Sequence, residues 1–449
     1  MSGSNKLNKQ QREAVGLLSI GTFLEYFDLM LYVHMAVLLN ELFFPKTDPF
    51  TASLISAFSF CSTFVFRPLG ALIFGYIGDT IGRKITIIIT TFLMAISCLV
   101  MANLPTYAQI GITASWIITV CRMVQGMSSM GEIVGAELYL TEMIKPPKQY
   151  FIVTMIAVVS VFGTVVALAV ASLVTSFGFE WRLAFWVGAG VALIGSVART
   201  SLRETPDFIN AKREITNRLE SVVDKDAIDQ DVFMQTKIDT KTTLSLFLIN
   251  CGWPGCFYFA YVHCGNVLKQ NFGFSSEEVI HHNLIVAIIQ LLGFLCTAWL
   301  SLKIHPFKII RTKFYIFLLL ILISPYLLSE INSSLGLLLF QAFLVLFACE
   351  SHPGVPIYFK HFPVFKRYTQ ASMSYAVSRA AMYIITSFGL VYLIKYFEHW
   401  GLVVLMLPIS IGFMVGVNYF QSLEDGMKQS AHSKTVSDQL KLKQNPVEN

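Results

Sequence analysis

The feature that most constrains this chain is a series of long segments that are almost free of charge. A helix needs roughly 20 mostly apolar residues to cross the hydrocarbon core of a bilayer. Twelve such segments cover residues 14–39, 51–77, 85–103, 108–139, 150–176, 182–201, 243–268, 276–301, 312–329, 334–358, 370–394 and 400–420. Strict alternation of apolar and polar residues is absent from them, which argues against a β-barrel. The sequence predicts an all-α membrane protein with twelve transmembrane helices.

Composition excludes several other classes of protein. Charged residues make up 14% of the chain, whereas about 25% is usual in soluble domains. This argues against a soluble enzyme, a disordered scaffold and a nucleic-acid binder. Nucleotide-binding loops, a GxSxG elbow and an HExxH helix are missing, and the eight cysteines show no metal-ligand spacing. We therefore expect no enzyme activity, no cofactor and no metal.

The basic residues predict the orientation of the chain. With the N-terminus in the cytoplasm, the cytoplasmic segments hold 25 Lys and Arg and the outer segments hold 4. Cytoplasmic loops carry such an excess, so both termini are expected inside. The first segment contains Glu25 and Asp28 and no cleavage site follows it, so it is not expected to be a removable signal.

The chain divides at its longest polar stretch. Six segments (1–201) precede a linker at 202–242, six follow at 243–420, and 421–449 forms a tail. This layout is typical of secondary carriers built from repeats. Thr205 and Pro206 favour the start of an amphipathic helix in the linker. For the Asp-rich part at 224–231, a disordered tether is an equal alternative.

Two acidic residues lie inside the first segment. Glu25 and Asp28 are three residues apart and Tyr32 follows four residues later, so all three share one helical face. Ionisable groups are expensive at bilayer depth, and two adjacent carboxylates there do not both stay ionised. The pair is therefore a candidate proton carrier. The alternative is a structural pair neutralised by an arginine from another segment.

The fourth segment carries a second set of charges. On a helical wheel Glu132 and Glu137 lie on either side of Arg122, so the three are expected to face one cavity. A guanidinium beside a carboxylate lowers the proton affinity of that carboxylate. The affinity therefore depends on whether substrate has separated the two groups. The alternative is a buried ion pair that only fixes the register of the helices.

Weaker signals lie in the second half. Residues expected to complete the cavity, or to pair with one another, are His263, Asn266, Glu350, His352 and Arg379. A lone histidine inside a membrane protein is more often simply hydrogen-bonded. The aromatic residues Trp253, Phe257, Tyr258 and Tyr261 are interpreted as packing residues, with a cage for a quaternary amine as the alternative.

Two features of the first half bear on packing. Arg67 directly precedes Pro68, so it is expected to cap a helix or to extend toward the membrane surface. Gly163, Ala167 and Ala171 are spaced four apart and predict a close approach of the fifth segment to a neighbour.

Two motifs resemble those of a known family. Residues 75–84 read GYIGDTIGRK and resemble the GxxxDxxGRK/R signature of the major facilitator superfamily, and RMVQG at 122–126 resembles its RxxQG motif. The segments 21–32, 66–79, 131–142, 181–182 and 202–208 resemble the metabolite:proton symporter family, which includes proline/betaine, α-ketoglutarate, citrate and shikimate permeases. The similarity is dense over residues 15–210.

The resemblance implies roles for individual residues. Asp79 and Arg83, with Gly75, Gly82 and Lys84 of the same signature, would belong to a cytoplasmic gate that holds the halves together. The residues that would couple protons are Glu25, Asp28, Arg122 and Glu132, and the expected cavity residues are Tyr32, Glu137, His263, Asn266, Glu350 and Arg379.

The sequence departs from the family pattern in three places. Thr80 replaces a basic residue of the signature, and the second-half loop at 301–308 lacks the Asp and Gly. The tail shows no heptad run, so no regulatory coiled coil is expected.

The expected function is proton-coupled import of a small zwitterionic osmolyte, such as proline or glycine betaine, across the bacterial cytoplasmic membrane by a monomer. The alternatives are symport of a dicarboxylate such as α-ketoglutarate and a sensor derived from such a carrier that no longer transports. The expected partners are the substrate, protons and the lipid bilayer. A channel is disfavoured because the acidic residues stand singly on different segments rather than in rings.

Overall fold

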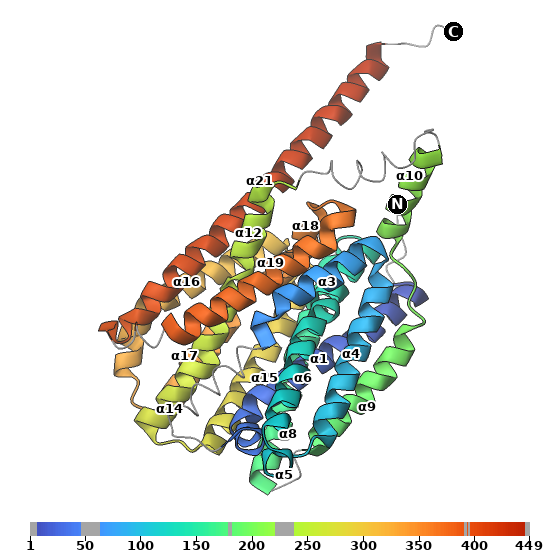
Figure 1. Ribbon diagram of the computed structural model, residues 1–449. Coiled ribbons are helices and arrows are strands. Elements are labelled where there is room, and N and C mark those ends of the chain that lie inside the picture. The colour runs from blue at the N-terminus through green and yellow to red at the C-terminus, as the bar shows by residue number, and fades with distance from the viewer. Residues whose placement is uncertain are drawn as a thin grey trace.

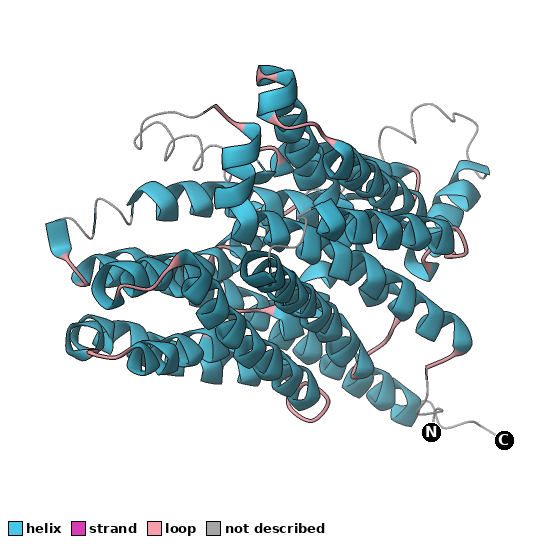
Figure 2. Cartoon of the chain, turned by 90° about the horizontal axis from the view of Figure 1, so that it is seen from below, coloured by secondary structure: helices cyan, strands magenta, loops and turns pink. Residues whose placement is uncertain are grey.

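The chain folds into a bundle of helices, seen from two directions in Figures 1 and 2. The computed structural model describes residues 7–45, 63–177, 182–220, 238–389, 393 and 396–444. These residues contain helices, turns and loops and no strand. The all-α prediction is therefore confirmed for the described part of the chain.

The first half contains the N-terminal helices and continues into the linker. Its elements are α1 (Lys9–Phe43), α3 (Arg67–Thr80), α4 (Arg83–Asn103), α5 (Tyr107–Ile110), α6 (Ile112–Ser129), the π-helix η1 (Met130–Val134), α7 (Gly135–Met143), α8 (Lys148–Phe177), α9 (Arg182–Arg199) and the linker helix α10 (Pro206–Glu220). The linker helix begins at Pro206 as expected, whereas residues 224–231 lie outside the described residues.

The second half follows the linker. Its elements are α12 (Thr240–Asn250), α13 (Gly252–Phe257), η2 (Tyr258–His263), α14 (Cys264–Phe272), α15 (Ser276–Leu300), α16 (Pro306–Glu330), α17 (Ser334–Phe347), η3 (His352–Gly354), α18 (Val355–Lys360), α19 (Val364–Ile384), η4 (Ile385–Gly389) and α21 (Trp400–Gln444). No boundary separates the last expected segment from the tail, because α21 continues to Gln444 and projects from the bundle (Figure 1).

Seven helical stretches among the described residues are long and apolar enough to cross a membrane. They are Lys9–Leu31, Arg83–Asn103, Lys148–Leu173, Glu277–Leu300, Pro306–Glu330, Ser334–Lys360 and Trp400–Gln429. Three of the five other expected segments are interrupted by the π-helices η1, η2 and η4. Such insertions occur mostly as short bulges at functional sites.

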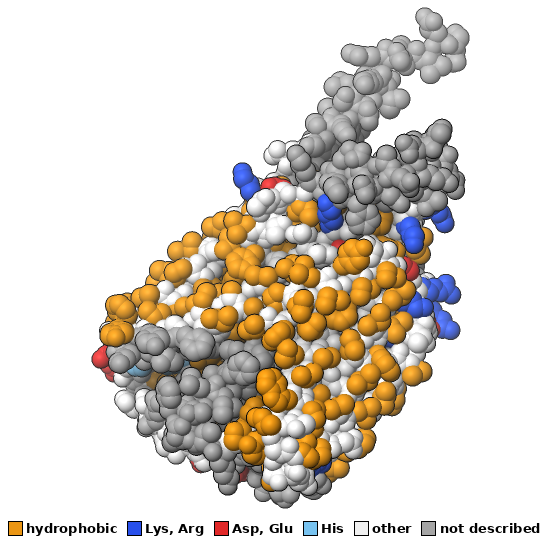
Figure 3. All heavy atoms as spheres, viewed as in Figure 1, with side chains coloured by type: hydrophobic (Ala, Val, Ile, Leu, Met, Phe, Trp, Pro, Cys, Tyr) orange, Lys and Arg blue, Asp and Glu red, His pale blue; other side chains and the backbone are white. Residues whose placement is uncertain are grey.

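The surface of the bundle is largely apolar. Figure 3 shows apolar side chains over the flank, and most of the visible Lys and Arg side chains near the end from which α21 projects. Large exposed side chains include Tyr76, Trp116 and Val197. An apolar flank of this extent fits a lipid environment and not water.

Glycines allow close helix contacts within and between the halves. A Cβ at Gly163 of α8 would lie 2.5 Å from the carbonyl oxygen of Phe23 in α1, so the expected close approach at this position is confirmed. Between the halves, α8 packs against α15 and α3 packs against α19. Gly75 and Gly78 make the second contact possible, because a Cβ would lie 2.8 Å from the Cα of Thr369 and 2.6 Å from the ring of Tyr368.

Candidate functional site

The two acidic residues of α1 face one enclosed space. Glu25 and Asp28 are buried and line a small cavity together with Arg67, Arg122 and Gln125. We call these five residues the carboxylate site. The shared face that the sequence predicts for Glu25 and Asp28 is confirmed, whereas the side chain of Tyr32 lies outside the described residues.

Arg67 occupies a different place from the one expected. Its side chain is buried, and its Nη2 lies 3.8 Å from Oε1 of Glu25. Its guanidinium lies over the ring of Phe64, 4.8 Å from the centroid. The prediction that Arg67 caps a helix or extends to the surface is wrong, because an acidic partner in the neighbouring helix holds it inside. Glu25 thus has the arginine partner that the structural alternative required.

Asp28 is linked to Arg122 through an amide. Nε2 of Gln125 donates to Oδ2 of Asp28, and Nη1 of Arg122 donates to Oε1 of Gln125 over 3.0 Å. Gln125 is not among the predicted site residues, although the RxxQG motif contains it. The Gln125 amide therefore forms a hydrogen-bonded bridge between the Asp28 carboxylate and the Arg122 guanidinium.

The structure separates Glu137 from Arg122. Their separation of fifteen positions corresponds to about 22 Å along a helix, at 1.5 Å per residue. Oε1 of Glu137 instead lies 3.3 Å from Nδ1 of His352 in the other half. The prediction of one cavity for both residues is wrong because a helical wheel ignores the rise. The side chain of Glu132 lies outside the described residues.

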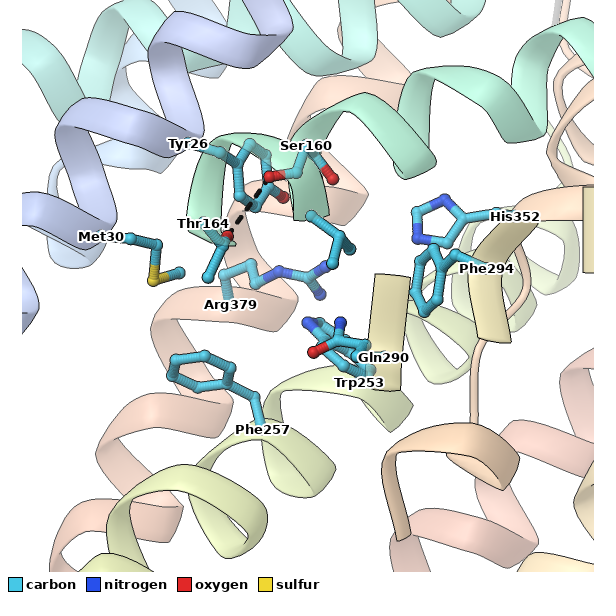
Figure 4. Close-up of a pocket in the computed structure, with 11 residues that line it drawn as sticks. Tyr26, Met30, Ser160, Thr164, Trp253, Phe257, Gln290, Phe294, His352 and Arg379 are labelled. Atoms are coloured by element: carbon cyan, nitrogen blue, oxygen red, sulfur yellow. Dashed lines mark hydrogen bonds between the residues drawn. The ribbon is translucent and has the colours of Figure 1, made fainter. Parts of the chain in front are cut away.

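A second space, the central pocket, lies between the halves (Figure 4). It is a narrow space of about 30 Å³ that is partly open to solvent. The first half supplies Tyr26, Met30, Ser160, Val161 and Thr164, and the second half supplies Trp253, Phe257, Gln290, Phe294, His352 and Arg379. A site between two repeats is where secondary transporters bind their substrates.

Arg379 is the strongest cation of the central pocket. Its side chain is buried, and its guanidinium lies over the ring of Tyr375, 4.2 Å from the centroid. Nη1 donates to the carbonyl oxygen of Asn250 over 2.8 Å. Acidic residues are absent from the described residues that line the pocket. A buried guanidinium without an acidic neighbour in its pocket is a ready partner for an anionic ligand group.

The wall of the central pocket is mostly aromatic. Trp253 packs against Phe257 and Phe294, with ring centroids 6.5 and 6.1 Å apart. The interpretation of Trp253 and Phe257 as packing residues is therefore incomplete, because both also line the pocket. The polar lining residues Ser160, Thr164 and Gln290 were missed, since single polar residues in apolar segments give no distinct pattern.

Three other second-half candidates do not line the central pocket. His263 packs against Phe259, with ring centroids 5.6 Å apart, and Asn266 is exposed. Oε2 of Glu350 accepts a hydrogen bond from Nζ of Lys313 over 3.0 Å. The expectation that these residues complete the central pocket is wrong, because none of them is among its lining residues.

The signature motif forms a third charged set at the end of the bundle from which α21 projects. Nη1 of Arg83 lies 3.3 Å from Oδ1 of Asp79, and its Nη2 lies 3.2 Å from Oε1 of Glu142. The same oxygen of Glu142 lies 3.1 Å from Nη1 of Arg367 in the second half. We call these four residues the Arg83 cluster, and all four are buried.

Asp79 also reaches across to the second half. Its carboxylate accepts hydrogen bonds from the backbone N–H groups of Tyr368 and Thr369 over 3.0 and 2.8 Å. It lies beyond the expected span that ends at residue 77. Burial raises the pKa of Asp79 to about 6, although Arg83 and the two N–H groups act in the opposite direction.

The beginning of the linker supports the Arg83 cluster. Glu204 accepts hydrogen bonds from the backbone N–H groups of Arg83 and Lys84, over 3.1 and 3.3 Å, at the start of α4. Gly82 has a φ of +145°, and a Cβ there would overlap the Glu204 carboxylate. The signature thus needs glycine at this position because of backbone conformation and space together.

Comparisons with known proteins place the chain in a family. A sequence profile of the Major Facilitator Superfamily matches residues 18–394. The chain is 29% identical over 294 residues to a proline/betaine transporter of Salmonella typhimurium, covering 63% of this chain and 57% of that protein. It is 31% identical over 388 residues to the inner membrane metabolite transport protein YhjE of Escherichia coli, covering 83% and 85%.

Solved structures show the same fold. The proton:xylose symporter XylE superimposes with a TM-score of 0.74 at 13% identity, covering 92% of this chain and 95% of that one. The transporter FucP in its outward conformation gives a TM-score of 0.66 at 13% identity, covering 91% and 97%. These relatives are transporters and not enzymes, in agreement with the sequence prediction. The chain belongs to the major facilitator superfamily.

Proposed function

We propose that this chain is a twelve-span, proton-coupled symporter that imports a small zwitterion with one carboxylate, such as proline or glycine betaine. It acts as a monomer in the bacterial cytoplasmic membrane, with both termini in the cytoplasm. The named relatives and the excess of Lys and Arg in the expected cytoplasmic segments support this assignment.

The observation that carries the proposal is Arg379 in an aromatic pocket without an acidic residue among its described lining residues. A guanidinium binds a carboxylate through paired, charge-assisted hydrogen bonds. The faces of Trp253, Phe257 and Phe294 suit the cationic end of the same molecule. A dicarboxylate requires a second cation, and the remaining basic residue, His352, is engaged with Glu137. The pocket therefore favours a zwitterion over a dicarboxylate.

The carboxylate site supplies the proton carrier in this proposal. Asp28 accepts a proton from the outer side, and the Gln125 amide keeps Arg122 near enough to favour its release. Glu25 and Glu132 contribute further acidic groups. In this proposal the contacts of the Arg83 cluster between the halves close the cytoplasmic end, and substrate enters the pocket from the outer side. Rocking of the halves then exposes the pocket to the other side.

Uptake into proteoliposomes under an imposed pH gradient tests the proposal. Proline and glycine betaine should compete with each other for uptake, whereas α-ketoglutarate and citrate should not. Arg379→Gln should reduce uptake at least about 100-fold, since it removes a buried charge-assisted contact worth about 3 kcal/mol or more. Arg311→Gln is the control, because Arg311 contacts Asn418 outside the pocket.

Three results would contradict the proposal. Stronger competition by dicarboxylates than by betaine would assign the pocket to the alternative substrate class. Normal uptake by Arg379→Gln would show that Arg379 does not bind the substrate. Failure of the wild type to take up any of these compounds would favour the sensor.

A further inference from the structure

A pair of tyrosine hydroxyls joins the two halves beside the central pocket. The hydroxyl oxygens of Tyr26 in α1 and Tyr375 in α19 lie 3.2 Å apart and share a hydrogen bond. Tyr26 also lines the pocket, as Figure 4 shows. The pair is therefore positioned to respond both to the substrate and to relative motion of the halves.

On the second-half side, the pair adjoins the proposed substrate contact. Arg379 lies one helical turn after Tyr375, and its guanidinium stacks on the tyrosine ring, 4.2 Å from the centroid. A carboxylate in the pocket would compete with this stacking for the guanidinium. Reorientation of Arg379 would leave the Tyr375 ring without the group that packs on it.

On the first-half side, Tyr26 belongs to the helix that carries the proposed proton site. Glu25 precedes it directly and Asp28 follows two residues later. The 100° step between residues turns Tyr26 toward the pocket while its neighbours face the carboxylate site. The Glu25–Arg67 ion pair spans 3.8 Å, so a small shift of α1 relative to α3 would separate it.

A row of aromatic rings forms a second connection to the same ion pair. Phe257 of the pocket wall packs against Tyr383, with centroids 6.3 Å apart, and Tyr383 packs against Phe64 at 4.2 Å. Arg67, the partner of Glu25, lies over Phe64 at 4.8 Å. Both connections therefore run from the pocket to the Glu25–Arg67 pair.

We propose that Tyr26 and Tyr375 are positioning residues that couple substrate binding at Arg379 to protonation of the carboxylate site. Binding of a carboxylate draws Arg379 from Tyr375, weakens the hydroxyl pair and lets α1 move away from Arg67. By linkage, protonation of the carboxylate site must raise the affinity for substrate by the same factor. The inference rests on the proposed symport and adds the residues that connect its two sites.

The test uses Tyr26→Phe, Tyr375→Phe and the double variant in proteoliposomes, because phenylalanine keeps each ring and removes only the hydroxyl. The readout is the ratio of uphill accumulation under a pH gradient to substrate exchange without one. Each single variant should lower this ratio about 10-fold, within the usual 5–150-fold range of coupling between sites. The double variant should lower it no further, since one hydrogen bond is lost in all three.

Tyr358→Phe is the matched control. Tyr358 is fully buried in the second half, and its hydroxyl has no hydrogen-bond partner among the described residues. This variant should keep the wild-type ratio.

The outcomes separate the inference from the proposed function. A wild-type ratio in both single variants would overturn the inference, as would equal losses of accumulation and exchange, which indicate a purely structural role. Losses that multiply in the double variant would also overturn it. If the wild type itself exchanges substrate but does not accumulate it under a pH gradient, the proposed symport is refuted, and the coupling with it.

Discussion

The Arg83 cluster and the carboxylate site are both buried sets of charges, but their acidic groups are paired differently. In the Arg83 cluster, Glu142 contacts two guanidinium groups at 3.2 and 3.1 Å, one from each half. In the carboxylate site, Gln125 hydrogen-bonds both Asp28 and Arg122, and Glu25 lies 3.8 Å from Arg67. Direct pairing across the halves suits a contact that fixes a conformation, whereas indirect pairing through an amide within one half, as at Asp28, suits a group that gains and loses a proton.

The largest expected effect comes from breaking the direct pairing. Glu142→Gln removes the charge shared by Arg83 and Arg367, and loss of one partner of a buried ion pair costs about 3–5 kcal/mol. The closed state should therefore open at this end. Spin labels at the exposed positions 145 and 303, one in each half, should show longer distances.

Glu13→Gln is the control for this variant. Glu13 pairs with Lys9 at 3.9 Å on the surface of α1, and an exposed pair of this kind contributes about 0.5 kcal/mol or less. Unchanged label distances in Glu142→Gln would show that the Arg83 cluster does not hold the halves together.

The second expected effect concerns the indirect pairing. Asp28→Asn keeps the shape of the side chain but removes its titration, so uphill accumulation should fall about 100-fold while downhill exchange falls much less. Glu132→Gln should act in the same direction. Radiolabelled substrate uptake with and without a pH gradient measures both quantities.

Glu350→Gln is the matched change at another buried carboxylate. Glu350 pairs with Lys313, and neither residue lines the central pocket, so its loss should lower stability without changing the ratio of accumulation to exchange. Normal uphill accumulation by Asp28→Asn would show that Asp28 does not carry the transported proton.

A smaller effect is expected from crowding the contact between the halves. In Gly78→Ala the new methyl group meets the Tyr368 ring, and overpacking of this kind costs about 1–3 kcal/mol. The added methyl of Gly190→Ala meets no atom within 4 Å, so this variant should behave like wild type. If the two variants unfold at the same temperature and give the same spin-label distances, the close approach of Gly78 to Tyr368 would be contradicted.

The smallest expected effect is a pH dependence at the Arg83 cluster. The pKa of Asp79 is about 6 in the closed state, above the value of about 3.9 for a solvated aspartate. Protonation therefore favours closure, and this stabilisation is lost as the pH rises through 6. Between pH 7 and pH 5 the closed population should gain about 10-fold over the open one. Asp79→Asn should abolish the dependence, and a closed population that instead falls on acidification would contradict it.

The sequence predicted most of the architecture because its signals are local. The length of an apolar segment identifies a helix without knowledge of its partners. The glycines of the signature are recognisable from the motif alone, although residues that are distant in sequence, such as Tyr368 and Thr369, make their contacts. Glu25 and Asp28 were assigned to one face because three residues on a helix fix their relation. Each of these inferences needs only a few neighbouring residues.

The pairing of charges was harder to predict because it depends on which helices meet. The sequence around Arg67 predicts a helix cap or a side chain at the membrane surface. Its actual partner, Glu25, belongs to another helix. Glu137 was matched with Arg122 by angle alone, and the rise of the helix placed it beside His352 instead. Gln290 and Ser160 enter the central pocket from separate helices, and nothing in their neighbouring sequence marks them.

In the proposed symport, one carrier moves a carboxylate-bearing substrate and protons together. Simultaneous recording of substrate uptake and internal pH in proteoliposomes, with no gradient imposed at the start, tests it most directly. The account predicts that added proline or glycine betaine acidifies the interior, and that Asp28→Asn abolishes the acidification while exchange persists. Substrate entry at a constant internal pH in the wild type would contradict it.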